Sequence, residues 1–125
     1  MIETWVVVGG SGTPMSSEAA RAALRVRIEG GRRETWLASS SGRALGLVTN
    51  TERAMVMLLD GDGDPGEHAV EPGARGSSAG FVLSNGQHDE YPNEDTVAIG
   101  EAFRIVDHIV SRGSWPPDTQ RVADR

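Results

Sequence analysis

Short stretches of alternating apolar and polar residues recur along this sequence, and such alternation is typical of β-strands. The pattern predicts strands over residues 4–8, 34–39, 44–49 and 54–59. Short turns join the last three, so we expect them to form an antiparallel meander. The first stretch is apolar and β-branched, which predicts a central or well-covered strand. The stretch 54–59 is apolar at every position, and we expect both of its faces to be covered.

Two further stretches have the spacing of amphipathic helices. In residues 16–28, serines precede an alanine-rich run, and apolar residues recur on one face. In residues 99–112 the apolar residues also fall on one face, and Gly113 follows as a helix stop. The first stretch has a rival interpretation, because residues 24–37 alternate around Gly30-Gly31 and could form a hairpin. We favour the helix because alanine has the highest helix propensity.

A tight hairpin turn is predicted at Asn85-Gly86, because this pair suits two positive-φ positions. Residues 81–83 precede it as a short apolar strand, and residues 87–91 follow as a polar return strand. Together these elements predict an α+β fold, in which an antiparallel sheet of five to six strands carries two helices. A length of 125 residues fits one domain over 1–125, with a partly irregular tail over 114–125.

Charge is distributed unevenly along the chain, whose formal net charge is -6. Between Asp60 and Asp95 there are nine acidic residues and one arginine, whereas Ser16–Arg53 holds seven arginines and four glutamates. An acidic surface repels free nucleic acid but attracts a protein whose own nucleic-acid site is basic. We therefore expect a protein partner and no direct contact with nucleic acid.

The chain has no cysteine, which excludes disulfides, thiolate metal sites and cysteine nucleophiles. This absence fits a reducing compartment. No stretch approaches the roughly 18 apolar residues of a membrane span, and the first residues lack the pattern of a signal peptide. We expect a cytoplasmic protein that does not contact a membrane.

The segment from residue 60 to residue 71 has the acidic spacing of a calcium loop. Its acids stand at positions 1, 3, 5 and 12 of such a loop, the last being Glu71. Pro65, however, occupies the position that needs glycine, and a strand precedes the segment in place of a helix. We interpret it as an acidic loop without a metal, and a calcium-responsive binding module is the first alternative. The acidic residues of this loop are Asp60, Asp62, Asp64 and Glu67.

Two patterns raise the possibility of an enzyme. The serines at 39–41 lack a Gly-x-Ser-x-Gly elbow, and turn chemistry explains them better. His88 and Glu90 match the His-x-Glu half of the zinc deaminase signature, but the cysteine half is missing, so the chain is not such a deaminase. We expect no catalysis and no cofactor. A small enzyme using these serines or His88 is the second alternative.

The stretch from Phe81 to Asp118 resembles the C-terminal half of immunity protein family 1, which accompanies bacterial polymorphic toxins. The resemblance rests on an Asn-Gly-Gln turn after a strand, an Asp-Glu-Tyr-Pro return, a Thr-Val lead-in and a helix that closes on Gly-x-x-Pro. Before Phe81 only the order of elements is similar. Members usually carry a tryptophan just after the terminal proline segment, where this chain has Arg121-Val122, so Trp115 would have to replace it.

The resemblance implies an immunity protein that binds and neutralises a cognate toxin. Partners of this family include cytosine deaminases that act on DNA, so the expected target is a nucleic-acid deaminase. Its active cleft must be basic to hold phosphates, and an acidic surface can occlude that cleft. The expected interface comprises Asn85, Gln87, Asp89, Glu90, Tyr91, Glu94, Asp95 and Trp115.

Overall fold

The computed structural model describes residues 3–124, in which two α-helices and nine short strands alternate with turns. In chain order the elements are β1 (Trp5–Val7), α1 (Ser17–Glu29), β2 (Glu34–Ser39), β3 (Ala44–Thr49), β4 (Arg53–Leu59), β5 (Glu67–Ala69), β6 (Ser77–Val82), β7 (His88–Pro92), the 3-10 turn η1 (Asn93–Asp95), β8 (Val97–Ala98), α2 (Ile99–Arg112) and β9 (Arg121–Ala123).

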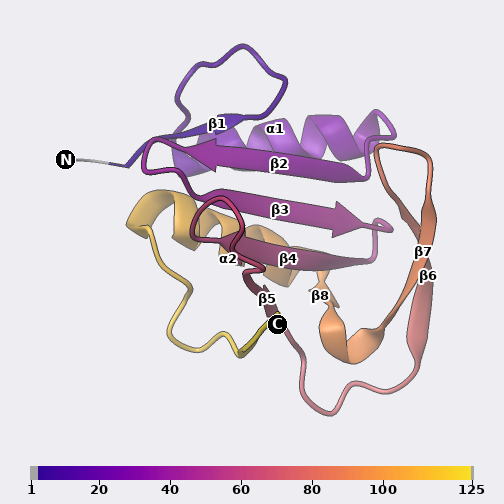
Figure 1. Cartoon of the computed structure of the whole chain (residues 1–125). Helices are drawn as coiled ribbons and strands as arrows, with labels where there is room; N and C mark the ends of the chain where they lie inside the picture. Colours follow the sequence, from indigo (N-terminus) through magenta and orange to yellow (C-terminus); the bar gives the residue numbers. More distant parts are fainter. Residues whose placement is uncertain (1–2, 125) are drawn as a thin grey trace.

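Seven of these strands form one antiparallel sheet in the order β1-β2-β3-β4-β5-β9 (Figure 1). The seventh strand, β8, pairs with Arg53 and Ala54 of β4, beside the place where β5 pairs with Met57 and Leu58. Strands β6 and β7 form a separate hairpin. Two helices on a largely antiparallel sheet confirm the predicted α+β class, with seven strands in the sheet where five to six were expected.

Both helices pack on the same face of the sheet, behind it in Figure 1. Alternate residues of β2, β3 and β4 point into this layer, and α2 contributes one buried stripe. The largest members of this core are at most 2% exposed: Trp5, Leu24, Leu37, Leu45, Val56, Ile105 and Ile109. Burial of apolar surface on this face is the main force that holds the layers together.

Local sequence signals set the ends of both helices. Ser16 caps α1, because its hydroxyl accepts a hydrogen bond from the backbone N–H of Ala19 at 3.1 Å. Gly113 ends α2 in the left-handed conformation at φ 78°, and its N–H donates to the carbonyl of Ile109 at 2.7 Å. The helix interpretation of residues 16–28 is confirmed, and the alternative hairpin over 24–37 is wrong.

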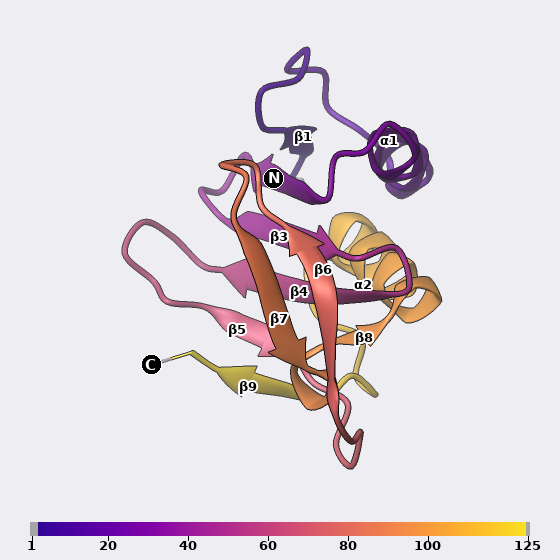
Figure 2. The ribbon, with the colours of Figure 1, turned by 90° about the vertical axis from the view of Figure 1, so that its right-hand side faces the viewer.

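The hairpin of β6 and β7 stands across one end of the sheet strands (Figure 2). It is held there by polar contacts to the ends of β2 and β3. The side-chain amide of Asn50 donates to the carbonyl of Ala79 at 3.0 Å, and the N–H of Ser84 donates to a carboxylate oxygen of Glu34 at 2.8 Å. A hairpin turn forms at the predicted place, with Gly86 at φ 88°, but the expected positive φ at Asn85 is wrong. The turn closes one residue earlier, because the N–H of Gly86 donates to the carbonyl of Leu83 at 2.9 Å.

Three expectations about strands need correction. The first strand lies at the edge of the sheet, although Trp5 is fully buried. The acidic segment over residues 60–71 is not a loop throughout, because Glu67–Ala69 form β5. In β4 only alternate residues are buried, and Met55 and Met57 remain partly exposed on the face without helices. The tail over 114–125, predicted to be partly irregular, contains the short strand β9; residues 1, 2 and 125 lie outside the described residues.

Candidate functional site on the helix-free face of the sheet

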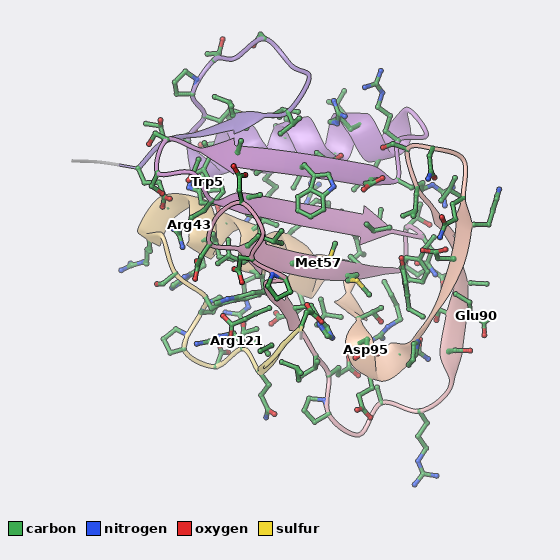
Figure 3. The ribbon with its side chains drawn as sticks, in the orientation of Figure 1. Trp5, Arg43, Met57, Glu90, Asp95 and Arg121 are labelled. Carbon is green, nitrogen blue, oxygen red and sulfur yellow. The ribbon has the colours of Figure 1, made fainter. Side chains whose placement is uncertain are left out.

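The face of the sheet opposite the helices carries a continuous row of side chains, which we call the helix-free face. Strand register places five residues side by side across it: Trp36, Gly46, Met57, His68 and Val122. Met57 points out of this face toward the viewer in Figure 3. Val122 is 49% exposed and Trp36 and Met57 are partly exposed. Neither helix covers this row, and its apolar side chains Trp36, Met57 and Val122 are accessible to a partner.

A histidine between two carboxylates closes one side of the helix-free face. The Nδ1 atom of His68 lies 2.8 Å from Asp124, and its Nε2 atom lies 3.0 Å from Asp95. These two contacts join η1, β5 and β9 at the rim of this face.

The hairpin forms a wall at the strand ends, on the same side as the helix-free face. Phe81 is fully buried and its ring centroid lies 4.8 Å from that of Tyr91. Val48 points to the helix-free side, yet it is only 2% exposed; β6 lies against its strand, β3. The hairpin thus has an apolar inner side that fixes it on the sheet.

Hydrogen bonds fix the ionisable side chains along β7. The hydroxyl of Tyr91 donates to Asp89 at 2.6 Å, and the amide of Gln87 donates to the same carboxylate at 2.6 Å. These two bonds lower the pKa of Asp89. Burial and the bond to Asp89 raise the pKa of Tyr91. Asp89 is therefore a charged carboxylate in a fixed orientation, and Tyr91 is a neutral donor.

The remaining residues of the expected interface are spread over the hairpin and beyond it. Asn85 lies at the exposed hairpin tip, where its side chain accepts the N–H of Gln87 at 2.9 Å. Glu90 lies on the outer side of the hairpin (Figure 3), and Glu94 is exposed on η1. Trp115 is only 7% exposed and belongs to the core, so a partner cannot reach it as an anchor. We leave Trp115 out of the candidate interface.

The acidic loop between β4 and β5 projects to the helix-free side, at the left of Figure 2. A carboxylate oxygen of Asp64 accepts the backbone N–H of Asp60 at 2.7 Å, and this bond, with one to Gly66, lowers the pKa of Asp64. Asp62 is exposed, and Glu67 lies 3.5 Å from Arg121 on β9. The loop therefore presents fixed negative charge beside the same face as Asp95 and Asp124.

The acids of the loop do not come together as a calcium loop would require. Glu71, the expected twelfth position, is instead paired with Arg53 at 2.8 Å. Arg53 also donates to the backbone of Asn93 and Thr96, which anchors η1 on β4. Among residues 3–124, no three histidine, aspartate or glutamate side chains are grouped closely enough to hold a metal ion.

The residues considered for an enzyme are also separated. Ser39 and Ser41 bond to each other at 2.9 Å, and the hydroxyl of Ser41 donates to Glu3. His88 is exposed on β7, and the Nδ1 atom of His108 lies 2.7 Å from the carbonyl oxygen of Ser114. Within the described chain no histidine is hydrogen-bonded to these serines, so a nucleophile with its base is not assembled there.

Sequence reasoning missed four residues that shape this face: Glu34, Trp36, His68 and Asp124. Two features of the sequence could have pointed to Glu34 and Trp36. Glu34 and Trp36 alternate with buried residues in a strand, which places both on one face. A glycine inside the next strand, Gly46, is typical of a close approach by another group. The pairing of His68 with acids 27 and 56 residues away has no local signal.

A scan of the sequence against models of protein families gives no match, and neither does a search of curated proteins. In the described part of the chain, neither helix is long and apolar enough to cross a membrane. The function has to be argued from the chemistry of the helix-free face and its rim.

Proposed function

We propose that this chain is an immunity protein that binds a bacterial toxin and covers its active cleft with the helix-free side. The observation that supports this most is the gathering of acids from distant parts of the sequence around one uncovered sheet face. They come from β2, the β4–β5 loop, β7, η1 and the residue after β9: Glu34, Asp60, Asp62, Asp64, Asp89, Asp95 and Asp124.

The arginines near this face are hydrogen-bonded mainly to groups other than its acids, although Arg43 lies close enough to Asp60 for their charges to interact. Arg43 pairs with Glu3 and donates to the carbonyl of Gly113. Arg53 is directed at η1 and Arg33 at the carbonyl of Gly80. A surface of this kind is complementary to a basic protein and repels nucleic acid.

The expected target is an enzyme that acts on nucleic acid, with a deaminase as the first choice. Such an enzyme needs a basic cleft for the phosphates of its substrate, and the acidic rim would occupy that cleft in their place. A stable complex needs about 800 Å² of buried surface on each partner, which is a modest share of this chain's 6905 Å². Trp36, Met57 and Val122, the apolar side chains of this row, supply the dry centre that tight interfaces require.

The test is inhibition of a toxin by the purified chain. A tagged chain is used to capture partners from its host, and the catalytic activity of each captured domain is measured with and without added chain. We expect stoichiometric inhibition, with association that slows as salt is raised.

A charge-matched pair of variants locates the binding side. The loop variant Asp60→Asn, Asp62→Asn should slow association several-fold, because it removes two charges from the helix-free side. The control variant Glu18→Gln, Glu29→Gln removes two charges from α1 and should leave association unchanged. If no captured domain is inhibited by the chain, or if both variants have equal effects, the proposal is contradicted.

A further inference from the structure

The indole ring of Trp36 lies directly on the backbone of Gly46. An added Cβ at Gly46 would stand 2.6 Å from two atoms of the six-membered ring, which is closer than any real contact. The inner face of the ring is therefore in van der Waals contact with the sheet. Since Trp36 is still partly exposed, the accessible part of its ring points outward, on the side that neither helix covers.

A fixed carboxylate stands at the edge of this ring. The indole Nε1–H donates to one oxygen of Glu34 at 2.9 Å, while the other oxygen accepts the N–H of Ser84 at 2.8 Å. These bonds lower the pKa of Glu34, with the backbone bond as the larger cause. Glu34 is thus held as an anion from two sides, and it holds the ring in one orientation.

Charges of both signs lie near this pair. Tyr91 lies close enough to Glu34 to be affected by its charge, and Tyr91 holds Asp89 in place. Arg27, Arg32 and Arg33 line the same hollow as Glu34, but Arg33 donates to the carbonyl of Gly80 and Arg27 to the hydroxyl of Thr35. In the described part of the chain no arginine lies over the ring of Trp36, and an aromatic face next to carboxylates is a suitable site for a cation.

We propose that Trp36 and Glu34 form a docking site for a guanidinium or ammonium group of the partner. The cationic head would lie on the outer face of the indole ring and contact the carboxylate of Glu34. The flat ring and the adjacent carboxylate suit an arginine better than a lysine, because a planar guanidinium both stacks and forms paired hydrogen bonds. The inference rests on the proposed function for the identity of the partner, but the chemistry of the site can be tested without it.

The first experiment uses the ring as its own reporter. Trp5 is fully buried and Trp115 is 7% exposed, so Trp36 is the most accessible of the three tryptophans. Caesium ions should quench the exposed emission more strongly than iodide ions, because the surrounding carboxylates attract cations. The variant Glu34→Gln should reduce this preference, whereas Glu18→Gln on α1 should not. Quenching that favours iodide would overturn the proposal.

The second experiment measures binding of a fluorescent oligo-arginine peptide by anisotropy, with an oligo-glutamate peptide as the opposite-charge control. The variant Trp36→Leu keeps the net charge and should weaken oligo-arginine binding about 5-fold. Trp36→Phe keeps an aromatic face and should retain most of the affinity. Glu34→Gln should weaken binding more than the charge-matched Glu18→Gln. Equal affinity of the wild type and Trp36→Leu, with both folded, would overturn the proposal.

The two proposals fail in different ways. If oligo-arginine binds through Trp36 but no toxin is inhibited, the cation site stands and the immunity function fails. If a toxin is inhibited but Trp36→Leu neither weakens that inhibition nor oligo-arginine binding, the function stands and the cation site fails.

Discussion

The two faces of the sheet are made from alternate residues of the same strands, but their surroundings differ. On the helix-covered face, Leu37, Leu45 and Leu58 lie in register and are at most 6% exposed. On the helix-free face, their neighbours Trp36, Gly46 and Met57 lie in register and face outward. One face is closed by α1 and α2, and the other is bordered by carboxylates. Residues that pack in the core and residues of the proposed binding face therefore alternate along each strand.

The largest effect should come from comparing adjacent residues of β4. Leu58 is 6% exposed and faces the helices, whereas Met57 is partly exposed on the helix-free face. Leu58→Ala should lower the free energy of unfolding by about 2–5 kcal/mol, because it leaves a cavity in the core. Met57→Ala should cost less than half as much. Urea denaturation measures both, and equal losses would contradict the separation of the two faces.

The contact between Trp36 and Gly46 gives the next largest effect. Gly46→Ala should destabilise the fold by about 1–3 kcal/mol, because the added methyl group forces the indole ring off the sheet. In a Trp36→Ala background the same change should cost almost nothing. A double-mutant cycle on the denaturation midpoint measures this coupling. A cost that is the same in both backgrounds would mean that the ring does not rest on Gly46.

Acid should lower the stability of the fold, because carboxylates on both sides of the sheet become protonated. The pKa of Glu3 is lowered from 4.5 to about 2, chiefly by its hydrogen bonds with Arg43. Since the pKa is lower in the folded state, the pair stabilises the fold above pH 4.5, and this contribution is lost as the pH falls toward 2. The pKa of Glu34 on the helix-free side is lowered too, and its contribution is lost in the same direction.

Melting temperatures across this acid range test the comparison. Glu3→Gln should flatten the decline of melting temperature with falling pH, because the titrating group is removed. Glu34→Gln should flatten it less, because Glu3 is paired with a cation and Glu34 is not. Glu18→Gln serves as the control on α1. A decline that Glu3→Gln leaves unchanged would show that this ion pair does not link folding to pH.

The smallest effect should come from the contacts of His68 with Asp95 and Asp124. Asp124→Asn weakens one of the two contacts of the His68 ring and should lower global stability by less than about 1 kcal/mol, because Asp124 remains partly exposed. The amide protons of β9 should nevertheless exchange faster, since β9 pairs with β5 beside this contact. Hydrogen exchange followed by NMR resolves the two outcomes. Unchanged exchange in β9 would indicate that backbone pairing alone holds the strand.

Sequence patterns predicted the elements whose form is decided locally. The serine cap and alanine-rich start of α1, the apolar stripe and glycine stop of α2, and the Asn85-Gly86 turn all act within a few residues of themselves. These signals were sufficient for the α+β class and for both helices.

Elements that depend on pairing with residues distant in sequence were not predicted. Strands β5 and β9 have three residues each; β5 is a strand because it pairs with β4 and β9, and β9 because it pairs with β5 at the sheet edge. The acidic loop was recognised from its charge, but its neighbours in space, Asp95 and Asp124, were not predictable without the fold. Trp115 was assigned to the interface because an aromatic residue near acids is a common anchor, and burial in the core decided otherwise.

Strand β4 pairs with β8 at Arg53 and Ala54, so the chain leaves β4 at residue 59 and returns to the same strand at residue 97. This excursion holds nine acidic residues and one arginine, yet it contributes only Ala69 and Val97 to the main core. Because both of its ends are fixed on β4, the entropic cost of closing it grows only slowly with its length. We therefore expect the helix-covered core to tolerate insertions and substitutions within the excursion better than changes within β2, β3 or α2.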